Sequence, residues 1–177
     1  MMTYSLQLFA PWRSRRAGRI RKEKLHPVGN YHDLPCGKPS GGVWTSTYTP
    51  LEKTESDWLR FCTQEHPYWI PAYGYLYSPD PAARLFTIDS VSDLQSLVSE
   101  YGVRKVCCPP YEIDWNAVAR DYEGVHLTRS GLAAGEAHGL ESWDAECTVW
   151  FRIDGLRYAG RIRLCRSSVP KRPPEKV

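Results

Sequence analysis

The apolar residues of this chain are gathered in short runs, each about the length of a β-strand, and this pattern most constrains the fold. The runs cover residues 41–48, 73–77, 84–88 and 146–153. The clearest helix is predicted over 92–101, because its apolar residues recur at helical spacing. Strands and helices are mixed without a regular β–α–β alternation. The sequence therefore predicts an α+β fold with mainly antiparallel strands.

The composition is that of a soluble domain. The chain has 177 residues, of which 42% are hydrophobic and 24% are charged. No run of about 18 apolar residues is present, and the first basic cluster follows the apolar N-terminal residues, which is the wrong order for a secretory signal. We therefore expect a cytoplasmic protein that does not enter a membrane. We expect three segments: a flexible basic arm over 1–24, one domain over 25–166 and a basic, proline-rich tail over 167–177.

Charge is distributed unevenly along the chain. The net charge is +6 over residues 1–24, −9 over 25–151 and +6 over 152–177. Two basic ends on an acidic body suit a polyanionic partner such as nucleic acid. The alternative is a pair of solvated tails, which is favoured because neither end interleaves aromatic residues with its charges along the sequence.

The end of the domain is predicted as a β-hairpin, because strand-like runs over 146–153 and 156–164 flank an Asp-Gly turn. Alternation in the first run turns its odd-numbered residues toward the core and places Glu146, Thr148 and Trp150 on the other face. A carboxylate in this position can bind a sugar hydroxyl or stabilise a developing positive charge. The alternative is an ordinary solvent-facing glutamate on an edge strand.

Few local motifs of known chemistry are present. The sequence contains no GxGxxG, GxxxxGK[ST], HExxH or GxSxG pattern. A zinc site is a minor alternative, because two His/Cys pairs could supply four ligands: His32 with Cys36, and Cys62 with His66. Neither pair has the tight CxxC spacing of a zinc knuckle. Cys62 is better explained as part of an apolar helix face, so we expect no metal site. The segment 129–143 is predicted to be a loop.

Two segments together resemble the ADP-ribosyltransferase superfamily, which includes poly(ADP-ribose) polymerases and bacterial toxins. Residues 41–46, Gly-Gly-Val-Trp-Thr-Ser, precede a helix containing Trp58 and are similar to its nicotinamide-pocket region. Residues 146–151, Glu-Cys-Thr-Val-Trp-Phe, resemble its catalytic-glutamate strand. The resemblance covers roughly residues 25–151 and implies a split, mainly antiparallel β sandwich with a few short helices.

Two shorter patterns are similar to the toxin branch of that superfamily. Residues 45–47, Thr-Ser-Thr, resemble its Ser-Thr-Ser strand, and Asp144-x-Glu146 is similar to its Glu-x-Glu pair. The resemblance implies that Glu146 is catalytic, bonding the 2′-hydroxyl of the nicotinamide ribose and supporting an oxocarbenium-like state. Asp144 and Glu141 would face the acceptor.

The resemblance also implies a set of residues that bind NAD, which is a substrate here. They are His26, Gly42, Trp44, Thr45, Ser46 and Trp58. Trp44 would lie against the nicotinamide ring, and Thr45 and Ser46 would brace Glu146 or bind ribose. The family places a His or Arg on an early strand, for which His26 is the nearest match. The alternatives for that position are Arg19, Arg21 and His32.

The function implied is transfer of ADP-ribose from NAD to a macromolecular acceptor, protein or nucleic acid, with release of nicotinamide. We expect a monomer. An NAD glycohydrolase would use the same pocket with water as the acceptor. A different class of function is an inactive α+β module that binds nucleic acid or a protein through its basic termini.

Overall fold

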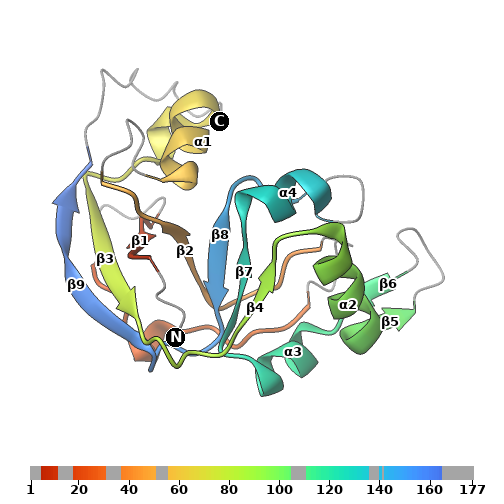
Figure 1. Ribbon diagram of the computed structural model, residues 1–177. Coiled ribbons are helices and arrows are strands. Elements are labelled where there is room, and N and C mark those ends of the chain that lie inside the picture. The colour runs from red at the N-terminus through yellow and green to blue at the C-terminus, as the bar shows by residue number, and fades with distance from the viewer. Residues whose placement is uncertain are drawn as a thin grey trace, which may run out of the picture.

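The computed structural model describes residues 5–11, 18–30, 37–50, 56–104, 111–135, 140 and 142–164. Within these residues the main feature is a seven-stranded sheet in the order β4-β7-β8-β2-β1-β3-β9 (Figure 1). Its strands are β1 (Gln7–Phe9), β2 (Val43–Thr47), β3 (Tyr73–Pro79), β4 (Leu85–Ile88), β7 (Gly124–Leu127), β8 (Cys147–Trp150) and β9 (Leu156–Arg163). Only β4 and β7 are parallel neighbours, so the α+β, mainly antiparallel prediction is confirmed.

Four α-helices occur in the described part of the chain: α1 (Asp57–Glu65), α2 (Val91–Tyr101), α3 (Trp115–Asp121) and α4 (Arg129–Gly135). The 3₁₀ helices η1 (Lys22–Lys24) and η2 (Pro67–Trp69) are single turns. A small second sheet pairs β5 (Gly102–Arg104) with β6 (Tyr111–Ile113). Among the described residues, no helix combines the length and apolar character needed to cross a bilayer.

The helices begin where short polar side chains cap them. Ser90 accepts a hydrogen bond from the amide of Asp93, whose carboxylate returns one from the Ser90 hydroxyl. Ser56 caps α1 by accepting a hydrogen bond from the Leu59 amide, and Asp114 caps α3 by accepting one from the Ala117 amide. Trp115 follows the Asp114 cap and is 1% exposed, so it anchors the start of α3 in the core.

The sheet has an apolar face and a polar face. One set of alternate strand residues packs with α2 and α3 in a cluster that includes Ile88, Leu97, Val118, Val125, Leu127 and Val149. The same face of the other half of the sheet packs with α1 in a cluster that includes Leu8, Leu59, Cys62, Leu76 and Leu164. We call this helix-covered side the outer face and the opposite side the inner face. The residues that alternate with these along the strands belong to the inner face, for example Gln7, His126 and Thr148.

The structure corrects the expected start of the domain. Residues 1–24 were predicted to be a flexible arm, but β1 lies between β2 and β3 inside the main sheet. Leu8 is 1% exposed and is part of the cluster beneath α1. Burial of this side chain, together with two antiparallel neighbours, fixes the segment in the domain.

The predicted hairpin between β8 and β9 is wrong. β8 pairs with β2 on one side and β7 on the other, so neither of its backbone edges is free for β9. β9 instead pairs with β3 at the far edge of the sheet. The Asp-Gly dipeptide still forms a turn, which connects β8 in the interior of the sheet with β9 at its edge.

The predicted loop over 129–143 contains a helix instead. Thr128 caps α4 by accepting a hydrogen bond from the amide of Gly131 at 3.0 Å. A Cβ on Gly131 would lie only 2.0 Å from the Ile88 carbonyl oxygen. The glycine-rich composition therefore permits close packing of α4 on the end of β4.

Candidate active site

A buried carboxylate lies where β8 begins, next to the end of β2. Glu146 is 7% exposed. Its Oε2 accepts hydrogen bonds from the Ser46 hydroxyl at 2.9 Å and from the Thr47 amide at 3.0 Å. Its Oε1 accepts one from the Thr47 hydroxyl at 2.8 Å. Donors from β2 therefore hold both oxygens of the carboxylate.

Strand register explains this arrangement. Thr45 of β2 lies opposite Thr148 of β8, and extending the antiparallel register by two residues places Thr47 opposite Glu146. Three consecutive hydroxyl residues, 45–47, occupy this end of β2. Because side chains alternate along a strand, Ser46 reaches the carboxylate from the outer side and Thr47 from the inner side.

Gln7 of β1 extends the network across the inner face. Its Oε1 accepts a hydrogen bond from the Thr45 hydroxyl at 2.7 Å, and its Nε2 donates to the Thr47 oxygen at 3.3 Å. The Thr45 oxygen in turn accepts from the indole N–H of Trp150 at 2.9 Å. Each group donates to the next in the direction of Glu146. Such a chain strengthens the bonds it contains and rigidifies the carboxylate.

His126 of β7 approaches the same carboxylate from the other side. Its Nδ1 lies 2.8 Å from the Thr148 hydroxyl and 3.7 Å from Glu146 Oε1. Burial lowers the pKa of His126, and the carboxylates of Glu146 and Asp89 offset only part of that effect. The imidazole is therefore neutral at pH 7 and has one ring nitrogen able to accept a proton.

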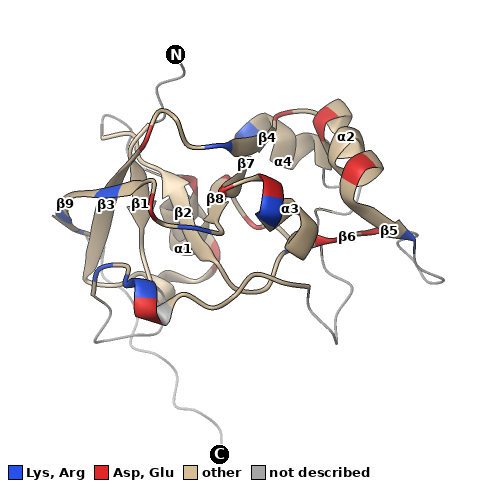
Figure 2. Ribbon diagram, turned by 90° about the horizontal axis from the view of Figure 1, so that it is seen from below, with Lys and Arg blue, Asp and Glu red and all other residues tan. Residues whose placement is uncertain are grey.

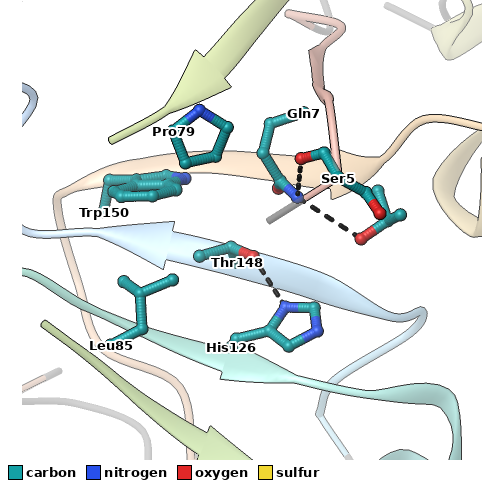
Figure 3. A pocket seen from close by; sticks show the side chains of 8 residues that line it. Ser5, Gln7, Pro79, Leu85, His126, Thr148 and Trp150 are labelled. Atoms are coloured by element: carbon teal, nitrogen blue, oxygen red, sulfur yellow. Dashed lines mark hydrogen bonds between the residues drawn. The ribbon is translucent and has the colours of Figure 1, made fainter. Parts of the chain in front are cut away.

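The inner face holds a cavity of about 200 Å³ beside these groups (Figure 3). It is lined by Ser5, Gln7, Thr47, Pro79, Leu85, His126, Thr148 and Trp150. Pro79 ends β3 and Leu85 begins β4, which lie toward opposite edges of the sheet, so the sheet curls around the cavity. Glu146 adjoins the cavity through its contacts with Thr47 and His126.

The structure brings together three of the predicted site residues, Thr45, Ser46 and Glu146. Trp58 takes part through its main chain, because its amide lies 3.4 Å from the Ser46 hydroxyl oxygen and donates to it. The Trp58 ring stacks on Trp69, with 6.1 Å between the ring centres. Its predicted contact with nicotinamide stays a prediction.

Other predicted NAD-binding residues lie away from the cavity. Trp44 alternates onto the outer face, where its ring meets that of Trp143 edge-on at 5.0 Å. Gly42 has a φ of +67°, and a Cβ there would lie 2.9 Å from the Trp150 carbonyl oxygen, so glycine permits the close approach to β8. His26 contributes its carbonyl, which accepts from the Gly42 amide at 3.1 Å, while its side chain is exposed.

One of the two predicted acceptor-facing residues, Asp144, pairs with Lys38 and not with a residue of the network. The exposed Asp144 carboxylate lies 2.7 Å from Lys38 Nζ. Glu141 and His32 lie outside the described residues. Arg21 is exposed before η1.

The minor zinc alternative gains no support from the described residues. Cys62 is fully buried in the α1 cluster, as its helical position predicts. The His66 ring stacks on Trp69 with 3.9 Å between the ring centres. In the part of the chain that the structure describes, no three His, Cys, Asp or Glu side chains gather in a way that could hold a metal ion. Cys36 lies outside that part.

Sequence reasoning missed two residues of the network, Gln7 and His126. Gln7 stands between Leu6 and Leu8, an alternation typical of a strand with one buried face. His126 stands between two apolar residues in the same way, a pattern that fits an ordinary surface or hydrogen-bonded histidine as well as a site residue. Both signals were available in the sequence, but nothing in it indicated that these strands lie on either side of β2 and β8.

Comparison with known proteins assigns no family, because no family model, curated protein or solved structure matches this chain. The fold and the site define an α+β protein with a buried carboxylate, anchored by hydroxyl groups beside an inner-face cavity.

Proposed function

We propose that the protein is an NAD-dependent ADP-ribosyltransferase that releases nicotinamide and transfers ADP-ribose to a macromolecular acceptor. The observation that carries this proposal is the Glu146 carboxylate, held by Ser46 and Thr47 beside the cavity. The two segments that resemble the superfamily supply these groups, and β2 and β8 are direct neighbours in the sheet.

The arrangement of the strands also supports the split β sandwich implied by the resemblance. The sheet curls about its inner face and carries its helices on the outer face (Figure 1). The early strand next to β2 is β1, so Gln7 replaces His26 as the candidate for the early-strand position. A glutamine amide can bond ribose hydroxyls but carries no charge, so phosphate binding falls to other residues.

The close hydrogen-bond donors to Glu146 leave it free of a direct charge-neutralising partner among them. Its three close donors, one from Ser46 and two from Thr47, are all uncharged. A carboxylate has about four lone-pair directions, so it retains capacity for a substrate hydroxyl. A fixed negative charge in a buried site stabilises the positive charge that develops on ribose as the glycosidic bond to nicotinamide breaks.

His126 supplies a base on the other side of the carboxylate. A neutral imidazole can take the proton that the acceptor loses when its oxygen or nitrogen bonds to the ribose carbon. The cavity of about 200 Å³ is smaller than a typical ligand pocket of about 300–1,000 Å³. It suits the nicotinamide riboside end of NAD, with the rest of the dinucleotide extending outside.

The test is nicotinamide release from NAD by the purified full-length protein. Glu146→Gln removes the charge with little change of shape, and we expect it to lower the release rate by at least about 100-fold, as for other fixed electrostatic groups. Glu65→Gln, at the exposed end of α1, is the matched control and should keep full activity. Thermal melting checks that both variants fold.

The outcomes separate the alternatives. Release that depends on Glu146 and leaves labelled ADP-ribose on protein or nucleic acid establishes a transferase. Release that yields only free ADP-ribose identifies an NAD glycohydrolase. If the wild-type protein releases no nicotinamide with any acceptor, the transferase proposal fails and a binding module becomes the better description.

A further inference from the structure

A second group of residues on the inner face combines exposed tyrosines with arginines. Tyr73 on β3 and Tyr158 on β9 are 42% and 38% exposed, which is unusual for large aromatic side chains. The group also includes Arg19, Arg161 and Arg163. We call these five residues the tyrosine–arginine strip.

Each of the two tyrosines in the strip is stacked with an arginine. The Arg161 guanidinium lies 4.5 Å from the centre of the Tyr73 ring, and the Arg19 guanidinium lies 3.7 Å from that of Tyr158. Arg163 lies directly opposite Tyr73 in the strand register. The arginines come from separate segments, 18–21 and β9, so the fold creates an interleaving of rings and charges that neither end of the sequence shows alone.

The strip belongs to the same face as the cavity. Tyr158 lies opposite Tyr77, Tyr77 lies opposite Gln7, and Gln7 lies opposite Thr47. Cross-strand partners share a face, so this row runs from β9 to the residues that contact Glu146. Tyr77 in the middle of the row lies beneath segment 18–21, because its hydroxyl accepts a hydrogen bond from the Ile20 amide at 2.8 Å.

The surrounding charge favours a polyanion at this edge. The sequences of β3 and β9 contain no Asp or Glu, and β9 carries three arginines. Figure 2 shows acidic residues on α2, α3 and β6, away from the basic strand β9. A negatively charged chain is therefore attracted to one side of the molecule.

We propose that the tyrosine–arginine strip binds single-stranded nucleic acid. Exposed tyrosine rings stack on unpaired bases, and neighbouring arginines contact the phosphates or extend the stack. Tyr158 lies opposite Tyr77, which is four residues from Tyr73 along β3. Four residues span roughly 13 Å, so more than one base can be held. Nucleic acid bound to the strip would lie on the inner face of the sheet, the same face as the cavity. The role of the strip as an acceptor site rests on the proposed transferase function.

Protection of an edge strand does not explain all of these features. Charged side chains on β9 discourage edge-to-edge pairing with another chain. That role needs arginines alone, whereas two exposed rings held against guanidinium groups add stacking surfaces. An acidic protein segment would use the charges and have little need for the rings.

The experiment measures fluorescence anisotropy of labelled 20-nucleotide single-stranded DNA, single-stranded RNA and duplex DNA with the full-length protein. We expect a single strand to bind more tightly than the duplex, with affinity falling as salt rises. Tyr73→Ala and Tyr158→Ala should each weaken binding about tenfold, the effect typical of losing one stacked base. Arg161→Gln should reduce the slope of log affinity against log salt by about 0.7.

Matched controls lie outside the strip. Tyr68→Ala removes a tyrosine that is 52% exposed on η2, and Arg104→Gln removes an exposed arginine at the end of β5. Both variants should bind as the wild type does. Thermal melting excludes unfolding as the cause of any loss.

Three results would overturn the inference: no binding to either single strand, binding that is indifferent to both strip tyrosines, or equal competition by polyglutamate. The last two would indicate purely electrostatic attraction to acidic chains. The inference and the proposed function fail separately. Nicotinamide release without binding of single-stranded nucleic acid would contradict only the proposed role of the strip. Binding of single-stranded nucleic acid by a wild-type protein that never cleaves NAD would contradict only the transferase proposal.

Discussion

The outer and inner faces of the main sheet are made by alternate residues of the same strands, yet they are organised by different interactions. On β7, Val125 and Leu127 are fully buried in the apolar cluster under the helices, and His126 between them reaches Thr148 on the inner face. The outer face is held by non-directional apolar contact. The inner face is held by directional hydrogen bonds that converge on Glu146.

Adjacent residues of one strand therefore serve different purposes: outer-face residues stabilise the fold, and inner-face residues build the candidate site. Apolar burial tolerates modest shifts of side chains, whereas a buried polar group is costly unless its partners are in place. The inner-face network meets that requirement and at the same time orients a carboxylate. We therefore expect outer-face substitutions to act mainly on folding and inner-face substitutions mainly on activity.

The largest effect on stability is expected from Leu127→Ala on the outer face. Leu127 is fully buried, and its truncation leaves a cavity that costs about 2–5 kcal/mol. Thr87→Ala, the exposed inner-face residue opposite His126, should change stability by no more than about 0.5 kcal/mol. Urea unfolding measures both values. Equal losses for the two variants would remove the proposed distinction between the faces.

Gln7→Ala is expected to lower stability less than Leu127→Ala does, but to lower activity more. The change leaves the Thr45 and Thr47 hydroxyls without their amide partner, at a cost of about 1–3 kcal/mol. The carboxylate loses its support, so nicotinamide release should fall well beyond what partial unfolding explains. Gln95→Ala, on the exposed side of α2, is the control. Unchanged release by a folded Gln7→Ala protein would exclude Gln7 from the site.

The smallest effect is a pH dependence that originates at His126. Its pKa is lowered in the folded protein, so below its ordinary value of about 6.5 protons bind the unfolded chain more readily. The stability that the neutral imidazole contributes is present above pH 6.5 and is lost as the pH falls through the lowered pKa. His126→Asn, which does not titrate, should show a weaker fall in the free energy of unfolding between about pH 7 and 5. Parallel curves for the two proteins would contradict the inner-face assignment of His126.

Prediction from sequence succeeded where interactions are local. The alternation that put Cys147, Val149 and Phe151 toward the core is confirmed, because those residues pack in or against the outer-face cluster. Helix α2 was also predicted correctly, since its cap and its apolar spacing lie within one short segment. The pairing of Ser46 with Glu146 followed only from the family resemblance, because 100 residues separate the two side chains.

Prediction failed where one segment competes with another for the same partner. The Asp-Gly signal favours a local hairpin, but β2 and β7 occupy both edges of β8. β1 has only three residues, and its surroundings in the sheet, rather than its length, make it a strand. The glycines of α4 indicate a loop until the close approach of the Ile88 carbonyl explains them.

The sequence by itself determined that alternate residues of β8 face the core, that 92–101 forms a helix, and that β2 ends in consecutive hydroxyl side chains. These properties depend on neighbours along the chain. Only the tertiary structure decided that β1, β2, β8 and β7 bring Gln7, Thr47, Glu146 and His126 together, and that arginines from two separate segments stack on exposed tyrosines. A backbone edge can pair with one strand only, so the choice of partner depends on every other strand in the sheet.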